Sequence, residues 1–239
     1  DWRVHVRRLV IESVGYLRTL GRAVGQGWSR FFFTPADPTP LGLIRVIIGT
    51  LAFWNLLVYG LDLQAFLGAT GWAEARLTRQ IVHDQNPMIW SFWFWVPDPL
   101  LRPVWIGCLV VLALFTLGMF SRVTVVLAWV IVTSTLRRAT ILGYGYDQIA
   151  STLILYLAVA GASGQALSVD RFLSRWMQFR DELRSRRPKG DWSPSSGVPR
   201  PSISANIALR LIQLHLVLIY GMAGIAKLQG QGWWAGFAV

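Results

Sequence analysis

Cysteine and histidine are scarce in this chain of 239 residues. The single cysteine, Cys108, lies inside an apolar run, so neither a disulfide framework nor a cysteine-based zinc site is available. The three histidines are too scattered along the sequence to suggest a metal site. We also find no P-loop, GxSxG, HExxH or dinucleotide-binding glycine pattern in a usable context. These absences exclude the enzyme classes that such motifs mark, and we predict no metal site.

Charged residues are scarce as well, and acidic ones most of all. Only 15% of the residues are charged, against about one quarter in an average soluble domain, while 54% are hydrophobic. This composition predicts an integral membrane protein. The formal net charge is +11, but the arginines gather in the segments between apolar runs. That distribution is typical of topology signals and of contacts with anionic lipid, so we expect no nucleic-acid partner.

The apolar runs predict an all-α integral membrane fold with about five transmembrane helices. Residues 1 to about 33 are expected to form an amphipathic helix that lies on the membrane surface. We divide the chain into this helix with its linker, 1–37, and a membrane domain, 38–239, which we expect to continue beyond Val239. The spans are predicted at about 41–60, 104–120, 123–138, 142–163 and 204–226.

Two longer segments separate the predicted spans. Segment 61–103 contains NPMIWSFWFWVPDP, in which the aromatic residues lie between prolines. The stretch between the prolines is too short to cross a membrane, so it suits an interfacial aromatic belt or a re-entrant piece. Segment 164–203 is predicted to be a loop with one amphipathic helix and a flexible part rich in proline and serine. The distribution of lysine and arginine places the N-terminus, Arg122 and 164–203 in the cytoplasm, and 61–103 and the chain end outside.

Lys227 stands near the end of the last predicted span, in GMAGIAKLQGQGWWAG. One interpretation is structural, because a lysine at the end of a span ordinarily extends to the lipid headgroups. The other starts from the small residues before it, which would let neighbouring helices approach closely: Gly221, Ala223, Gly224 and Ala226. Close packing would desolvate the ammonium and favour the neutral amine, which makes Lys227 a candidate catalytic base.

A second candidate group, Arg137, Arg138 and Asp147, lies in LRRATILGYGYDQ near the predicted outer end of two spans. An unpaired charge is costly there, so we expect these side chains to pair with one another. Such pairing indicates either a clamp between two helices or a pocket for an anion or substrate. Tyr146, on the same turn, can line a pocket of that kind.

His215 lies in the middle of the last predicted span. On a helix, His215 and Lys227 would be separated by about a third of a turn around the axis, so the two do not share a face. We expect a neutral histidine bonded to another helix, with Gln213 as a companion, and a proton relay is the alternative. Arg45 follows Pro40 closely and is expected to extend to the cytoplasmic surface, where it would contact lipid or support the structure.

Four ordered segments carry a family resemblance: PLGLIRVIIGTL, WSFWFWVPDPLLRPVW, GYDQIASTLILYLAVAGASGQALSVDR and LRLIQLHLVLIYGMAGIAKLQGQGWWAG. Together they resemble the HTTM (horizontally transferred transmembrane) domain, the bacterial relatives of vitamin K-dependent gamma-carboxylase, from about residue 38 to the end. The resemblance implies that Lys227 matches the lysine that deprotonates the hydroquinone in the carboxylases, and that Trp233 belongs to the same motif. The carboxylases carry a second lysine where this chain has Ala226, and their large lumenal region has no counterpart here.

The resemblance implies a multi-pass protein of the bacterial cytoplasmic membrane with an unassigned reaction. One hypothesis is base chemistry through Lys227 on a quinone or quinol cofactor or a lipid substrate. Its candidate binding residues are Arg137, Arg138, Asp147, Tyr146, His215 and Trp233. The alternative is a non-catalytic subunit or scaffold that docks partner membrane proteins and membrane lipids through the N-terminal helix and segment 164–203. Transport is less favoured, because we see no inverted repeat and no charged pair in mid-span.

Overall fold

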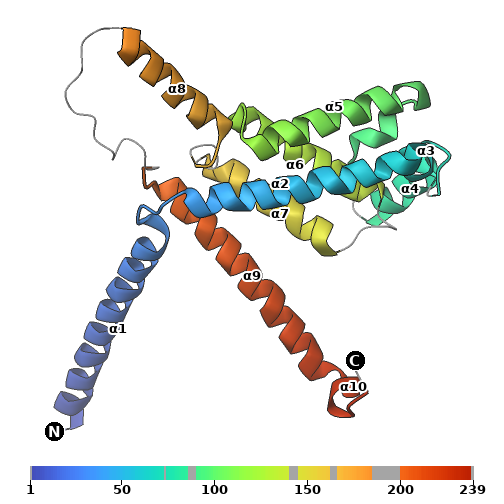
Figure 1. Ribbon diagram of the computed structural model, residues 1–239. Coiled ribbons are helices and arrows are strands. Elements are labelled where there is room, and N and C mark those ends of the chain that lie inside the picture. Colours follow the sequence, from blue (N-terminus) through green and yellow to red (C-terminus); the bar gives the residue numbers. More distant parts are fainter. Residues whose placement is uncertain are drawn as a thin grey trace.

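The computed structural model describes residues 2–72, 74–85, 90–139, 145–161, 166–184 and 200–237. The regular elements of this part of the chain are all helices, which confirms the all-α prediction (Figure 1). The α-helices are α1 (Trp2–Phe33), α2 (Thr39–Tyr59), α3 (Leu63–Leu67), α4 (Ala75–Gln85), α5 (Asp98–Leu117), α6 (Ser121–Arg138), α7 (Gly145–Ala160), α8 (Val169–Arg184), α9 (Ile203–Gln229) and α10 (Gln231–Trp234). The two short 3-10 helices are η1 (Gly60–Asp62) and η2 (Phe92–Trp95).

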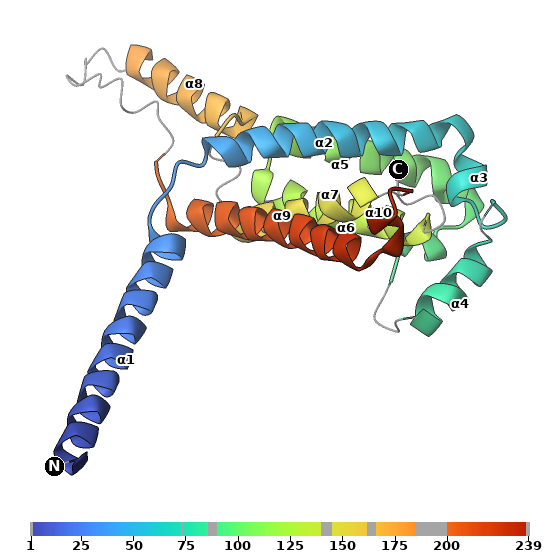
Figure 2. The same ribbon diagram turned by 90° about the horizontal axis from the view of Figure 1, so that it is seen from below.

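The long apolar helices run back and forth across one bundle. Helices α2, α5, α6 and α7 pack together, and α9 packs on α7 (Figures 1 and 2). Long helices occupy all five stretches that the sequence predicts as spans. Helix α5 begins earlier than expected, so Pro103 lies inside it. Part of the predicted fourth span, 142–144 and 162–163, lies outside the described residues.

Three helices among the described residues are long and apolar enough to cross a membrane: Thr39–Leu67, which continues α2 through η1 and α3, Asp98–Leu117, and Ile203–Gln229. Helix α6 has 18 residues and contains three arginines, and α7 is described over 16 residues. At 1.5 Å per residue, the described part of α6 rises about 27 Å and that of α7 about 24 Å, both less than the hydrocarbon thickness of about 30 Å. For α6 and α7, membrane crossing stays a prediction.

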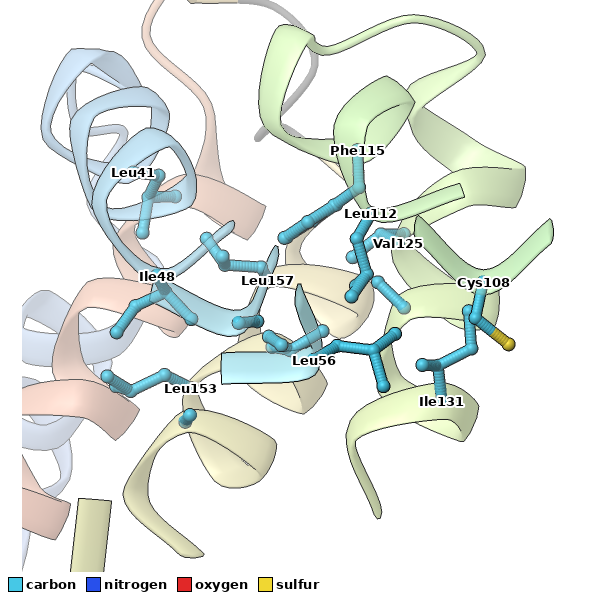
Figure 3. Close-up of a cluster of buried hydrophobic side chains, with 14 of the residues drawn as sticks. Leu41, Ile48, Leu56, Cys108, Leu112, Phe115, Val125, Ile131, Leu153 and Leu157 are labelled. Atoms are coloured by element: carbon cyan, nitrogen blue, oxygen red, sulfur yellow. The ribbon is translucent and has the colours of Figure 1, made fainter. Parts of the chain in front are cut away.

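The hydrophobic core lies where α2, α5, α6 and α7 meet (Figure 3). It includes Leu41, Ile48, Leu56, Cys108, Leu112, Phe115, Val125, Ile131, Leu153 and Leu157. On α2, α5 and α7 these residues recur every three, four, seven or eight positions, and on α6 the buried Ala128 lies between Val125 and Ile131 at a spacing of three, so each helix buries one face. Gly49 lets α2 approach α5 closely, since a Cβ atom there would lie 2.4 Å from Thr116 Oγ1. Any larger residue at this position would push the two helices apart.

The connection between α5 and α6 depends on a glycine with a left-handed backbone. Gly118 has φ 71° and ends α5, and the next amide, that of Met119, donates to the Leu114 carbonyl at 2.9 Å. This bond satisfies a carbonyl that the helix end would otherwise leave open. The turn therefore lies before Ser121, which begins α6, whereas the spans predicted at about 104–120 and 123–138 leave Ser121 and Arg122 between them.

Arg45 is buried, contrary to the expectation that it would extend to the surface. Its side chain is 1% exposed, and Nη2 donates to the carbonyl of Leu167 at 2.6 Å. The Asp170 carboxylate accepts bonds from the amides of Phe120 at 3.0 Å and Ser121 at 3.1 Å, and attracts Arg45. These residues, the Arg45–Asp170 cluster, connect α2, the start of α6 and the start of α8. Arg45 is buried because the segment that enters α8 folds over this end of α2.

The Arg45–Asp170 cluster should make stability depend on pH. Partial burial acts to raise the pKa of Asp170, but the hydrogen bonds from Ser121 and Phe120, with the charge of Arg45, lower it below its ordinary value. The folded chain then binds this proton less readily than the unfolded chain, so Asp170 stabilises the fold above about pH 4 and the stabilisation is lost as pH falls through the folded pKa. We expect Asp170→Ala to lower the free energy of unfolding by about 1 kcal/mol at neutral pH, as for a lost helix cap.

Thermal unfolding of the wild type and of Asp170→Ala across the acidic range measures this effect. The difference between the two proteins should shrink as pH falls below about 4. A difference that stays constant over that range would contradict the assigned role of the carboxylate.

Helix α1 extends away from the bundle and attaches near its end (Figures 1 and 2). The carbonyl of Phe31 accepts a bond from Asn206 Nδ2 at 2.7 Å, and the guanidinium of Arg210 lies 4.4 Å from the Phe31 ring centre. The predicted helix is confirmed, with exposed apolar side chains at Leu17 and Val24. Its place on a membrane surface stays a prediction. Helix α8 is the amphipathic helix expected within 164–203, and the part rich in proline and serine, 185–199, lies outside the described residues.

Candidate functional site

A small cavity, lined mainly by apolar side chains with a few polar groups, lies between α2, α5, α6 and α7, at the end of the bundle where α2 and α6 end and α7 begins. Its volume of about 20 Å³ is enough for one water molecule. Its polar lining comes from Asn55 and Tyr59 of α2, Thr135 of α6, and Tyr146 and Asp147 of α7. Two of the residues predicted from LRRATILGYGYDQ therefore line one cavity.

Asp147 is held in the cavity wall by a residue of another helix. Its carboxylate is largely buried and accepts a hydrogen bond from Asn55 Nδ2 at 2.7 Å. Asp147 also lies in the first turn of α7, where the helix dipole favours negative charge. Burial of a carboxylate is tolerated when such partners replace water. The contact connects α2 to α7 over 92 positions of sequence.

Tyr146 brings a hydroxyl group to the same cavity. Its Oη atom is buried and has no hydrogen-bond partner among the described residues. A buried hydroxyl without a partner is costly, and ordered water commonly satisfies such groups. The cavity is large enough for one water molecule, and Asp147 and Asn55 line it as well. The arrangement suits a bound water molecule or the polar end of a small ligand.

The two predicted arginines end α6 beside this cavity. Arg138 is fully buried, and its Nη2 atom donates to the Gly68 carbonyl at 2.6 Å, while Arg137 is half-buried. Positive charge at a helix C-terminus is favoured by the helix dipole. The Gly68 contact anchors α6 to the turn after α3, which is a structural role. The predicted pairing of both arginines with Asp147 stays a prediction.

The aromatic segment before α5 packs on this end of α6. Trp93 is 1% exposed, and its Nε1 atom donates to Thr135 Oγ1 at 3.1 Å. Ser91 Oγ donates to the Ser134 carbonyl at 2.8 Å. Of the two alternatives for this segment, an exposed interfacial belt does not describe Trp93, and a re-entrant piece stays a prediction. Trp93 belongs to the core because hydrogen-bond partners on α6 satisfy the polar atom of its ring.

The contact between Asn55 and Asp147 gives a direct test of the cavity wall. We expect Asn55→Ala and Asp147→Ala to be coupled by about 1–3 kcal/mol in a double-mutant cycle, because the hydrogen bond involves a charged acceptor in a buried site. Denaturant unfolding of the two single variants and the double variant in detergent measures the coupling. Additive effects would show that the bond contributes nothing beyond the two side chains.

Lys227 lies on the exposed far part of α9, outside the cavity wall. Its Nζ atom is 4.6 Å from the centre of the Trp233 ring, a cation–π contact that joins α9 to α10. A Cβ atom added at Gly221 or Gly224 would meet nothing within 4 Å. The described part of the chain therefore brings no helix against these small residues, and the close packing expected around Lys227 is not formed within it.

His215 contacts another helix, as expected. Its Nδ1 atom is 3.5 Å from Tyr156 Oη of α7, and the two rings meet edge to face. Gln213 bonds instead to Arg210, whose Nη1 donates to its Oε1 at 2.8 Å. The expectation that Gln213 joins His215 in its contact with another helix was therefore wrong, because Arg210 lies on α9 itself. The contact with Tyr156 indicates a structural role for His215 in holding α9 on α7.

Asn55 is the site residue that the sequence analysis missed. It is a single amide within the apolar run TLAFWNLLVYG, and a polar residue inside a predicted span is a functional candidate by default. That signal was available in the sequence. The partner of Asn55 was not, because the contact with Asp147 depends on how α2 and α7 pack.

No group of three or more histidine, cysteine, aspartate or glutamate side chains that could hold a metal occurs among the described residues. The geometry thus offers two separate features: the cavity of Asn55, Tyr146 and Asp147 at one end of the bundle, and the Lys227–Trp233 pair at the far end of α9, which diverges from the bundle (Figure 1). Scans against protein-family models, curated proteins and solved structures find no match to this chain.

Proposed function

We propose that the chain is a multi-pass membrane protein of the HTTM and gamma-carboxylase-like type, with α2, α5, α6, α7 and α9 as spans. The alternating direction of these helices supports the proposal. So does the position of the basic segments, because the starts of α2, α6 and α8 lie at one end of the bundle (Figure 1), and Arg122 is the second residue of α6. Under the proposal this end is cytoplasmic, in a bacterial inner membrane, and Lys227 faces outward.

Within that membrane domain, we propose that Lys227 acts as a base on a quinol or another lipid-soluble hydroxyl substrate. The observation that carries this proposal is the position of the Nζ atom 4.6 Å from the Trp233 ring centre, at the outward end of α9. Trp233 offers an aromatic surface on which a quinol ring can stack beside the amine. A neighbouring helix packed against the open Gly221 and Gly224 would desolvate Lys227 and favour its neutral amine. That amine would take the hydroxyl proton, leaving the substrate oxyanion and the Lys227 ammonium.

Oxygen uptake by the purified chain with an added quinol tests this chemistry. We expect Lys227→Ala and Lys227→Arg to lower the quinol-dependent rate by about 10²–10⁴-fold, the usual contribution of a general base. Lys189→Ala removes the only other lysine of the chain and serves as the control, with an unchanged rate expected. Equal quinol-dependent rates of oxygen uptake in the wild type, both Lys227 variants and Lys189→Ala would overturn the role of Lys227.

A second candidate function, a non-catalytic subunit or scaffold, is favoured by the exposure of α9. Only 6% of the most apolar 18-residue stretch of α9 is buried, although the helix is long enough to cross a membrane. Its far part presents Val217, Leu218 and Met222 beside the open small residues Gly221 and Gly224, a surface suited to a neighbouring helix.

Purification of the tagged full chain from its native membrane in mild detergent tests the scaffold function. A stoichiometric membrane partner is expected, and Gly224→Leu should release it by blocking close helix approach, whereas Gly107→Leu, an open glycine on α5, should not. Recovery of the chain without any partner would count against this function.

A further inference from the structure

A groove lies at the other end of the bundle, beside the start of α8. Its volume is about 590 Å³, within the range of about 300–1,000 Å³ typical of small-molecule sites. One wall is formed by Thr39 and Val46 of α2, with Leu117 of α5, and the other by Arg171 and Arg175 of α8. The groove shares no lining residue with the cavity of Asn55 and Asp147.

The start of the α8 wall of this groove is anchored to the bundle. Just before the helix, the Leu167 carbonyl accepts the bond from Arg45, and Ala166 and Ser168 are buried. At its first turn, Asp170 caps the start of α6. Beyond these anchors Arg171 is half-buried, and the side chains of residues 172–181 are exposed. The Arg45–Asp170 cluster thus fixes the helix turn that carries the groove arginines, on the side away from the core.

The groove has a cationic side. Arg171 and Arg175 are one helical turn apart, and both line it, while no acidic residue does. Burial lowers the pKa of Arg171, repulsion from Arg175 lowers it further, and nearby Asp37 acts in the opposite direction. Asp37 itself is exposed and accepts bonds from the amide and hydroxyl of Thr39. An anion between the two arginines would relieve their repulsion.

The part of the groove that runs along α2 is apolar. Thr39 to Val46 spans about 10 Å of helix rise, so the groove extends from the first residue of α2 well into its apolar length. Val46, Leu117 and Phe172 line this part, and the last two are more than half exposed. The positive charge of the groove comes from Arg171 and Arg175 near the start of α8, and its apolar lining faces the bundle. Such a site suits an amphiphile with an anionic head group.

We propose that this groove binds an anionic glycerophospholipid, with its phosphate between Arg171 and Arg175 and an acyl chain along Val46 and Leu117. The inference rests on the proposed membrane placement and is independent of the chemistry of Lys227. It assigns α8 a specific lipid site, in addition to general attraction to a charged membrane surface.

Titration of the purified full chain in detergent with short-chain phosphatidylglycerol tests the site. We expect the double variant R171Q/R175Q to weaken binding about 30-fold, because each basic residue at an anionic lipid surface contributes about a factor of five. The variant R180Q/R184Q removes the same charge from the same helix outside the groove, and its affinity should stay within about twofold of the wild type. Leu117→Trp keeps both arginines but fills the apolar part of the groove, and should also weaken binding.

Two further ligands identify what the groove recognises. Phosphatidylcholine with the same acyl chains, and glycerol phosphate without chains, should both bind much more weakly than phosphatidylglycerol. Equal losses in R171Q/R175Q and R180Q/R184Q, equal binding of phosphatidylcholine, or equal binding of glycerol phosphate would each overturn the lipid site. Alkaline carbonate extraction tests membrane placement separately, since a chain that stays in the membrane but lacks groove-dependent binding contradicts only this inference.

Discussion

Replacement of Trp93 by alanine is expected to lower the free energy of unfolding by about 3–5 kcal/mol, the usual cost of removing a fully buried tryptophan side chain. Trp93 is 1% exposed and packs with the end of α6. The variant would leave a cavity and would also remove the hydrogen bond from Nε1 to Thr135 Oγ1. Because Thr135 lines the cavity of Asn55 and Asp147, we expect the variant to loosen that site as well.

Trp95 provides a matched control two positions away. Its ring is 64% exposed, so Trp95→Ala removes the same side chain without creating a core cavity. We expect a change of less than about 1 kcal/mol, as for most surface substitutions. Denaturant unfolding of both variants in the same detergent measures the difference. Similar losses for the two tryptophans would contradict the assignment of Trp93 to the core.

The second large effect is expected at Arg45. Arg45→Ala should lower the free energy of unfolding by about 3–5 kcal/mol, because it removes a buried cation and leaves a cavity. The variant would also lose the bond to the Leu167 carbonyl and leave Asp170 without its nearby positive charge. A long side chain at this position could not simply turn to solvent, because the segment before α8 covers it.

Arg122→Ala serves as the control for Arg45, since Arg122 lies at the same end of the bundle and is exposed. We expect its effect to be within about 0.5 kcal/mol of zero. Arg45→Lys separates charge from shape, because lysine keeps the charge but cannot reproduce the planar guanidinium contact. Full stability in Arg45→Ala would mean that the side chain extends to lipid, as the sequence suggested.

The loss of Arg45 should also be visible at the proposed lipid site. The Arg45–Asp170 cluster holds the first turn of α8, and that turn carries Arg171. Weaker binding of phosphatidylglycerol in Arg45→Ala would therefore indicate that the anchor and the groove act together. This effect acts through the position of α8, since Arg45 does not line the groove.

The sequence alone predicted the helical class and the approximate places of the long helices. Apolar runs of about twenty residues and their polar separators carry this information locally, without reference to neighbours. It also singled out Tyr146 and Asp147, because charge and hydroxyl groups at the end of an apolar run are costly unless they have partners. Lys227 emerged from the same argument and from the family resemblance.

What the sequence could not determine was which partners these groups have. Asn55 and Asp147, or Arg45 and Leu167, are far apart in the chain, and their contacts exist only after α2 has packed with the later helices. The sequence also left two places open for the segment of Trp93, an interfacial belt or a re-entrant piece, and the burial of its ring depends on the hydrogen bond to Thr135 of α6. Local pattern thus determined which segments are apolar helices, whereas packing decided which polar groups are buried, because a buried polar group is stable only with a partner from elsewhere in the fold.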